Sequence, residues 1–239
     1  MSAFLYGVAL QWKLDIRSKT LLITCYIVPL LFFAVMGGIF TALMPEARGT
    51  LIQSMTVMGV SMGALIGLPP SLAETYGSDI KKVYQANGVP LYLGLVSMYL
   101  SAFVHLMLMS ILLYLVAPIA FHAAIPANPL AYFGALAVFI AVSLSVGCVL
   151  GLAVKSQAKL TMISQLFFLP SIMLSGIMFS IALLPKAFEL VGKFFPASWG
   201  FRLMVEGRFR LGTLWPLLVI FLLAAVLCGI LLQRMQAKR

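Results

Sequence analysis

Six apolar stretches, each long enough to cross a bilayer as a helix, run through this chain of 239 residues. They cover roughly residues 21–44, 51–72, 91–117, 130–154, 160–184 and 214–232. A helix needs about 20 apolar residues to cross the hydrocarbon core. Lipid offers no hydrogen-bond partner to unpaired backbone groups, so each stretch should be helical. The sequence therefore predicts an all-α, polytopic membrane protein with six transmembrane helices in a single domain, 1–239.

The charged residues support this class and indicate an orientation. They make up only 9% of the chain, whereas a soluble domain carries roughly 25%. The formal net charge is +10, and the basic residues lie between the apolar runs rather than on one face. This placement favours positive-inside topology over nucleic-acid binding. With both termini cytoplasmic, ten of the 16 Lys and Arg residues fall in inner segments, so we expect a multi-pass protein of the inner or plasma membrane.

Two segments outside the spans have amphipathic patterns. In residues 1–20, Phe4, Val8 and Trp12 recur every four positions, which predicts an interfacial helix on the membrane surface. Residues 185–213 contain two short amphipathic pieces, about 186–195 and 198–210, which are separated at Pro196. Pieces this short cannot cross the bilayer. They either re-enter the outer leaflet or lie along its surface, and spacing alone leaves both possibilities open.

The longest predicted cytoplasmic loop, 73–90, is also the most polar. Its charged residues are Glu74, Asp79, Lys81 and Lys82. Ser78 and Asp79 could cap a short helix that Asn87 and Gly88 would end. Such a helix would offer a docking surface to a partner, and the alternative is a solvated turn with basic anchors.

Residues that could carry chemistry within the predicted spans are few. His105 lies in the third span, and no acidic residue lies within any span. Coupled carriers usually need buried ionisable groups, so a stand-alone channel or secondary carrier is only the second choice. Ser101 lies one helical turn from His105, but a Ser and a His on one helix are a weak signal of catalysis. No metal-ligand spacing or phosphate-binding Gly-rich loop is present. We expect no catalysis, no metal site and no cofactor in this chain.

Small residues recur at helical spacing in the second span. Gly59, Gly63 and Gly67 are four positions apart. Small residues at this interval let two helices approach closely. The spacing predicts a packing face, either within the chain or between two chains.

Late in the chain, the residues from Leu174-Ser175-Gly176 to Phe179, followed by Pro185 and Pro196, resemble a family signature. The phrase is similar to the "LSG-x-x-F" stretch of ABC-2 type permeases, the membrane subunits of ATP-binding-cassette exporters. Glu74-Thr-Tyr-Gly77-Ser78 is similar to the Glu-x-x-Gly-Ser/Thr pattern of the same family. The order of parts also matches over nearly the full chain: an amphipathic N-terminal helix, six spans and a broken amphipathic hairpin before the last span, which the resemblance implies is re-entrant. Ser180 stands where the family often has Pro, and basic residues are missing at 73 and 75, which leaves the subfamily open.

The resemblance implies a permease subunit that moves an amphiphilic substrate outward: a drug, an antimicrobial peptide, a lipid or a lipid-linked glycan. It implies two copies of this chain in the lipid membrane and two separate ATPase subunits, which bind the ATP and Mg. The implied ATPase-coupling residues are Glu74, Gly77, Ser78, Lys81, Lys82, Asn87 and Gly88. The implied dimer contact and export path comprise Gly59, Gly63, Gly67, Ser171, Ser175 and Gly176. The implied outer gate comprises Phe179, Pro185, Pro196 and Arg202.

Overall fold

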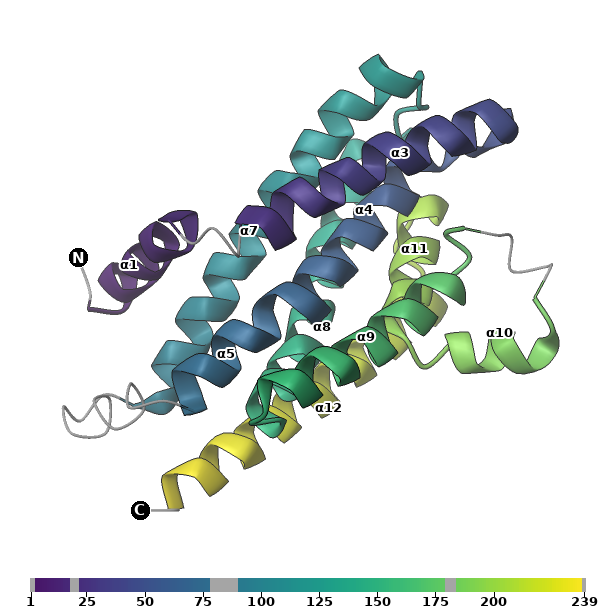
Figure 1. The fold of residues 1–239 in the computed structure, drawn as a ribbon. Helices are drawn as coiled ribbons and strands as arrows, with labels where there is room; N and C mark the ends of the chain where they lie inside the picture. Colours follow the sequence, from purple (N-terminus) through teal and green to yellow (C-terminus); the bar gives the residue numbers. More distant parts are fainter. Residues whose placement is uncertain (1–2, 18–21, 78–89, 179–183, 238–239) are drawn as a thin grey trace.

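Helices make up all the regular structure in the part of the chain that the computed structural model describes, residues 3–17, 22–77, 90–178 and 184–237 (Figure 1). This confirms the all-α class. Five helical stretches are long and apolar enough to cross a membrane: Ile23–Leu43, Leu51–Gly77, Leu91–Phe121, Pro129–Ala153 and Leu211–Ala237. They coincide with the first four predicted spans and the last.

The fifth predicted span, 160–184, differs from the expectation. Helix α9 (Gln157–Met173) has 17 residues and ends well before residue 184. A turn follows it, in which Gly176 has a φ of +86°, a conformation that a side chain disfavours. The stretch is therefore not one unbroken helix, and a sixth crossing stays a prediction.

Two of the spans contain a π-helical turn, and prolines explain both. The first span is η1 (Ile23–Ile27) followed by α3 (Val28–Leu43), and the second is α4 (Leu51–Met62), η3 (Gly63–Gly67) and α5 (Leu68–Gly77). Pro29 follows η1, and Pro69-Pro70 follow η3. A proline has no N–H to donate to the residue four positions earlier, so the helix takes a wider turn there.

Helix α8 (Pro129–Ala153) lies in the middle of the bundle, and two glycines bring it against the second span. A Cβ atom on Gly147 would clash with the carbonyl oxygen of Ala64, and one on Gly151 would lie 2.9 Å from that of Pro69. The second span is accordingly central, with 83% of its most apolar window buried. Helix α12 (Leu211–Ala237) packs against α8 from the outside. Only 17% of its most apolar window is buried, so most of its surface is left for lipid.

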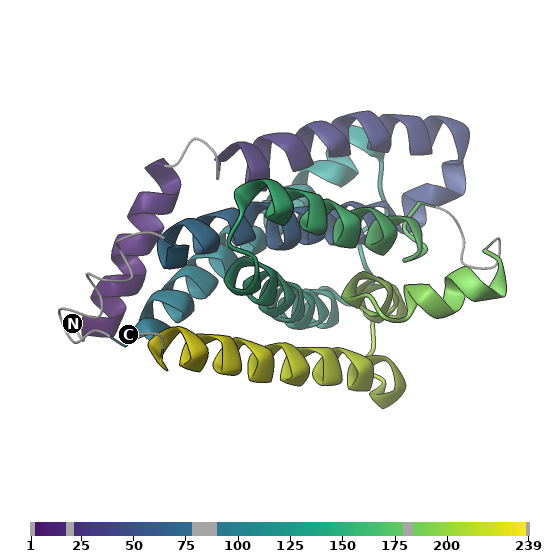
Figure 2. The ribbon, with the colours of Figure 1, turned by 60° about the horizontal axis from the view of Figure 1, so that its bottom comes forward.

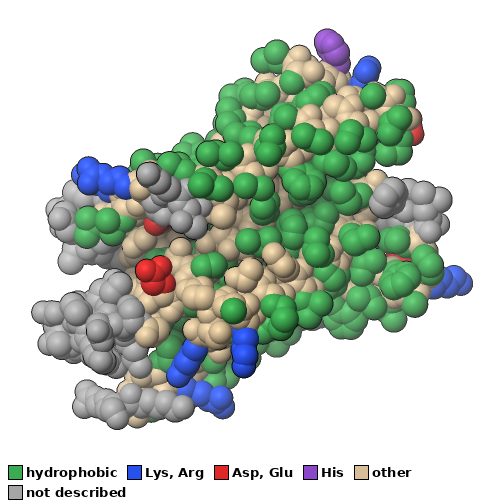
Figure 3. Space-filling model, in the orientation of Figure 1, with side chains coloured by type: hydrophobic (Ala, Val, Ile, Leu, Met, Phe, Trp, Pro, Cys, Tyr) green, Lys and Arg blue, Asp and Glu red, His purple; other side chains and the backbone are tan. Residues whose placement is uncertain are grey.

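The two termini and the start of α7 (Leu91–Phe121) lie at one end of the bundle, which we call the N/C end (Figure 1). Helix α1 (Ala3–Arg17) lies across this end, at a steep angle to α3 and α12 (Figure 2). Hydrophobic side chains cover the middle of the face in Figure 3, and Lys and Arg side chains gather toward the ends. This distribution is the one that a membrane-spanning bundle requires.

The opposite end carries short elements. The 3-10 helix η2 (Pro45–Gly49) joins the first two spans, and α10 (Lys186–Gly192) and α11 (Pro196–Glu206) precede α12. Helix α11 packs against α8 and α12, whereas α10 projects from the bundle (Figure 1).

Candidate functional site

The predicted coupling region begins and ends at the N/C end. Glu74 and Gly77 are exposed on the last turn of α5. The hydroxyl of Tyr76 donates a hydrogen bond of 2.6 Å to the carbonyl oxygen of Leu91, at the start of α7. This bond joins the two helices on either side of segment 78–89. The other predicted coupling residues, Ser78, Lys81, Lys82, Asn87 and Gly88, lie outside the described residues.

Helix α1 is joined to α7 through a carboxylate that the sequence analysis did not single out. Ser101 Oγ donates a hydrogen bond to Oδ2 of Asp15. Gln11 Nε2 donates to the other carboxylate oxygen at 2.8 Å. Ser101 is buried, so this contact brings an acidic group from the predicted interfacial helix against a membrane span.

His105, one turn along α7, forms the second part of this contact. The ring of Trp12 stacks on the His105 ring at 4.5 Å between centroids and an interplanar angle of 6°. The hydroxyl of Tyr26 lies 2.7 Å from Nδ1 of His105. The three side chains join α1, the first span and α7. In the structure Ser101 bonds to Asp15 and His105 to Tyr26 rather than to each other.

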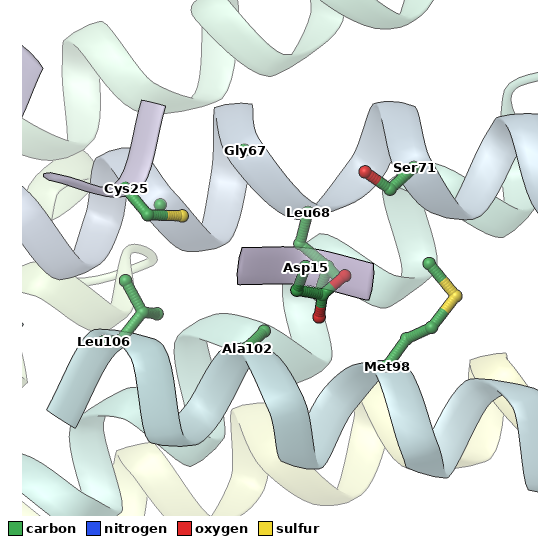
Figure 4. Close-up of a pocket in the computed structure, with 9 residues that line it drawn as sticks. Asp15, Cys25, Gly67, Leu68, Ser71, Met98, Ala102 and Leu106 are labelled. Carbon is green, nitrogen blue, oxygen red and sulfur yellow. The ribbon is translucent and has the colours of Figure 1, made fainter. Parts of the chain in front are cut away.

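A small cavity lies beside Asp15. Figure 4 shows Asp15 between the second span, near Leu68, and α7, with Cys25 of η1 also lining the cavity. The cavity has a volume of about 10 Å³, which is room for one water molecule at most. In the described ranges, no three His, Cys, Asp or Glu side chains gather as a metal site would require. The contacts of this region therefore join α1, the first span and α7.

The glycines of the second span pack inside the chain. A Cβ atom on Gly59 would lie 2.5 Å from Cε of Met109, and one on Gly63 would clash with the Leu106 side chain. A Cβ atom on Gly67 would lie 3.4 Å from Sγ of Cys25. Of the two alternatives, packing within the chain is thus the one that the structure shows for these faces. A role in a dimer contact or export path stays a prediction.

The Leu174-Ser175-Gly176 turn, which we call the LSG turn, ends α9. Ser175 is buried, and its hydroxyl donates to the carbonyl oxygen of Ile172 at 2.7 Å. Ser171, one turn earlier, is also buried, and its hydroxyl has no partner among the described residues. The predicted path residues Ser171 and Ser175 therefore face protein rather than an open channel within this single chain.

The LSG turn supports the junction of α10 and α11. A Cβ atom on Gly192 would lie 2.6 Å from the carbonyl oxygen of Leu174, so only glycine allows this approach. Ser198 Oγ donates to the carbonyl oxygen of Gly192 at 2.7 Å. Trp199 Nε1 donates to that of Lys193 at 2.7 Å. These bonds hold the bend between the two short helices.

The predicted outer-gate residues fall at different places around this junction. Pro185 is exposed and precedes α10, whereas Pro196 is buried at the first position of α11, where its missing N–H costs nothing. The predicted break thus begins the second helix rather than separating it from the first. The Arg202 guanidinium lies 5.4 Å from the centroid of the Trp199 ring, a cation–π contact. Phe179 lies outside the described residues.

A comparison with known proteins identifies a family whose model matches this arrangement of helices. The family model of the ABC-2 type transporter matches residues 3–209. The matched range contains α1, the ends of α5 and α7, the LSG turn and both short helices, and it ends just before α12. A comparison with curated proteins gives no match.

Proposed function

The chain belongs to the ABC-2 type transporter family, and we propose that it is the permease subunit of an ABC exporter. In this proposal it moves an amphiphilic substrate outward, with energy from a separate ATPase subunit. The family match over residues 3–209 is the observation that carries the proposal. The candidate substrates are a drug, an antimicrobial peptide, a lipid or a lipid-linked glycan.

The N/C end faces the cytoplasm and receives the ATPase in this proposal. Segment 78–89 is the docking site, flanked by Glu74 and Gly77. The Tyr76–Leu91 hydrogen bond supports it, because a displacement of the segment reaches α5 and α7 together. The Asp15–Ser101 bond then links the same movement of α7 to α1.

Two copies of the chain surround the export path in this proposal. Helix α9 supports a contact with the second copy, because one of its faces is apolar and exposed. That face comprises Met162, Leu166, Leu169 and Met173. Segment 185–210 closes the path on the outer side, and the bonded α10–α11 junction would move there as one piece.

Reconstitution in vesicles tests the proposal. Vesicles that contain the chain and its co-isolated ATPase should move substrate only with ATP. Transport by the chain alone would overturn the proposal and support a stand-alone channel or carrier. The double variant Lys81→Glu and Lys82→Glu should lose the ATPase on purification. Its matched control, Lys155→Glu with Lys159→Glu, places the same charge change just before α9 and in its first turn, and should retain the ATPase.

A further inference from the structure

A second, larger cavity opens at the end of the bundle opposite the N/C end. Its volume is about 470 Å³. The residues that line it belong to the end of η2, the start of α4, the connection between α7 and α8, the end of α11 and the turn that follows α11. Four of them bear polar side chains: Gln53, Asn128, Glu206 and Arg208. The cavity is thus a polar site in a chain that is otherwise mostly apolar.

Gln53 is the first sign that the cavity takes a ligand. Its side chain is 5% exposed, and its Oε1 has no hydrogen-bond partner among the described residues. A buried acceptor without a partner costs free energy, so such groups are rare unless a ligand completes them. The ligand that Gln53 would satisfy carries an N–H or O–H donor.

Two opposite charges border the same cavity. Glu206 is the last residue of α11, and Gly207, with a φ of +59°, turns the chain so that Arg208 also lines the cavity. Thr213 Oγ1 donates to Oε2 of Glu206 at 3.2 Å, which orients the carboxylate. The negative end of the α11 helix dipole adds to the potential of this carboxylate and favours a cation there. The guanidinium of Arg208 suits a phosphate.

The depth of the cavity indicates the source of such a ligand. Its lining residues lie at the start of the second span and in the segments that connect the ends of the membrane spans, so it opens at the level of the lipid headgroups. Large apolar side chains nearby are exposed as lipid-facing residues are, namely Leu130, Leu211 and Trp215. Tryptophan is enriched at this level of a membrane.

We propose that this cavity binds the headgroup of a zwitterionic phospholipid, a phosphodiester that carries a primary ammonium group. The phosphate lies at Arg208 and the ammonium lies at Glu206. Oε1 of Gln53 is covered in the free protein and accepts a headgroup N–H once the Gln53 side chain turns toward the cavity. A choline headgroup has no N–H, so it fits less well. This site is independent of the proposed transport function, since it would hold a resident lipid whatever the cargo.

Native mass spectrometry of the purified full chain tests the proposal. The probes are dihexanoyl phosphatidylethanolamine, the phosphatidylcholine and phosphatidylglycerol analogues, and soluble O-phosphoethanolamine. We expect one phosphatidylethanolamine per chain, bound about tenfold more tightly than the other three, which corresponds to about 1.4 kcal/mol. Equal binding of the three lipids would overturn the headgroup assignment. Equal binding of O-phosphoethanolamine would overturn the lipid assignment.

Variants locate the binding in this cavity. Glu206→Gln and Arg208→Gln should each weaken phosphatidylethanolamine binding by about tenfold, because each removes a charge-assisted hydrogen bond. Gln53→Leu should weaken it as well, with thermal unfolding measured to confirm folding. Arg210→Gln is the control: the residue is exposed on the same connection but does not line the cavity. An equal loss in Arg210→Gln, or no loss in the first two variants, would overturn the site.

Discussion

Asp15 of α1 accepts a hydrogen bond from Ser101 of α7, 86 positions along the chain. The carboxylate is oriented by Gln11, and the neighbouring Trp12 stacks on His105. Helix α1 is therefore joined to α7 by a hydrogen bond to a carboxylate and by the stacking of two aromatic rings. Both contacts lie on α7 within one helical turn, so α1 and α7 should move together.

Replacing Asp15 with Ala should loosen α1. Hydrogen bonds to a charged group contribute about 1.5–3 kcal/mol, and Asp15 accepts one of its bonds from a buried side chain. Hydrogen exchange of the α1 amides should become faster, while that of α8 should not change. Lys13→Ala, an exposed change on the same helix, is the control. Unchanged α1 exchange in Asp15→Ala would show that the bond does not hold the helix.

Replacing Tyr76 with Phe should weaken the connection between α5 and α7. The variant removes the 2.6 Å bond to Leu91 and leaves the ring in place. A net loss of about 1 kcal/mol is expected. Substrate-stimulated ATPase activity of the assembled complex should fall more than its basal activity. Tyr92→Phe is the matched control, because Tyr92 is exposed on α7 beside Leu91. The same response from both variants would rule out this link.

Replacing Gly63 with Ala should destabilise the bundle. The new methyl group meets Leu106, and overpacking of this kind costs about 1–3 kcal/mol. Gly229→Ala on α12 is the control, since nothing lies within 4 Å of the added atom. There the helix propensity of Ala should give a neutral or slightly stabilised protein. Thermal unfolding in detergent measures both, and adding Leu106→Ala to Gly63→Ala should restore part of the loss.

The pKa of Glu189 on α10 should lie below its usual value. Lys193 Nζ is 3.0 Å from Glu189 Oε1, and this hydrogen bond and its charge favour the carboxylate. The folded pKa is the lower one, so the contribution of the pair is present at neutral pH and lost as the pH falls through that pKa. Both side chains are exposed enough that the effect on unfolding should be small. Carboxyl ¹³C NMR should show a larger upward shift of the midpoint in Lys193→Gln than in Lys186→Gln, and the reverse order would contradict this assignment.

The sequence was sufficient for the features that depend on one stretch at a time. Hydropathy placed five spans, because each is long and apolar enough by itself. The glycine spacing at Gly59 and Gly63 predicted close packing, but no local pattern could say that Met109 and Leu106 were the partners. Gly176 and Pro196 both lie in the family signature. Only the backbone conformation shows that Gly176 lies in the turn after one helix and that Pro196 begins another.

The Asp15 contact could not be predicted for a different reason. Asp15 lies in an amphipathic helix whose pattern predicts a membrane surface, and charged residues are ordinary there. Asp15 accepts a hydrogen bond from Ser101 only because α1 packs against α7. The packing of two helices that are distant in the sequence leaves no local pattern. Ser101 and His105 could be recognised in the sequence as a pair one helical turn apart. The sequence did not show which residues contact them. The polar cavity at Gln53 and Glu206 required the same long-range information.

The π-helical turn at Gly63–Gly67 has a practical consequence for anyone who places probes on the second span. An extra residue in one turn rotates everything beyond it by about 100° relative to a regular helix. Positions such as Gln53 and Ser71 therefore cannot be assigned to one side on a single helical wheel. Cysteine pairs for cross-linking two copies should be chosen from separate wheels above and below the widened turn.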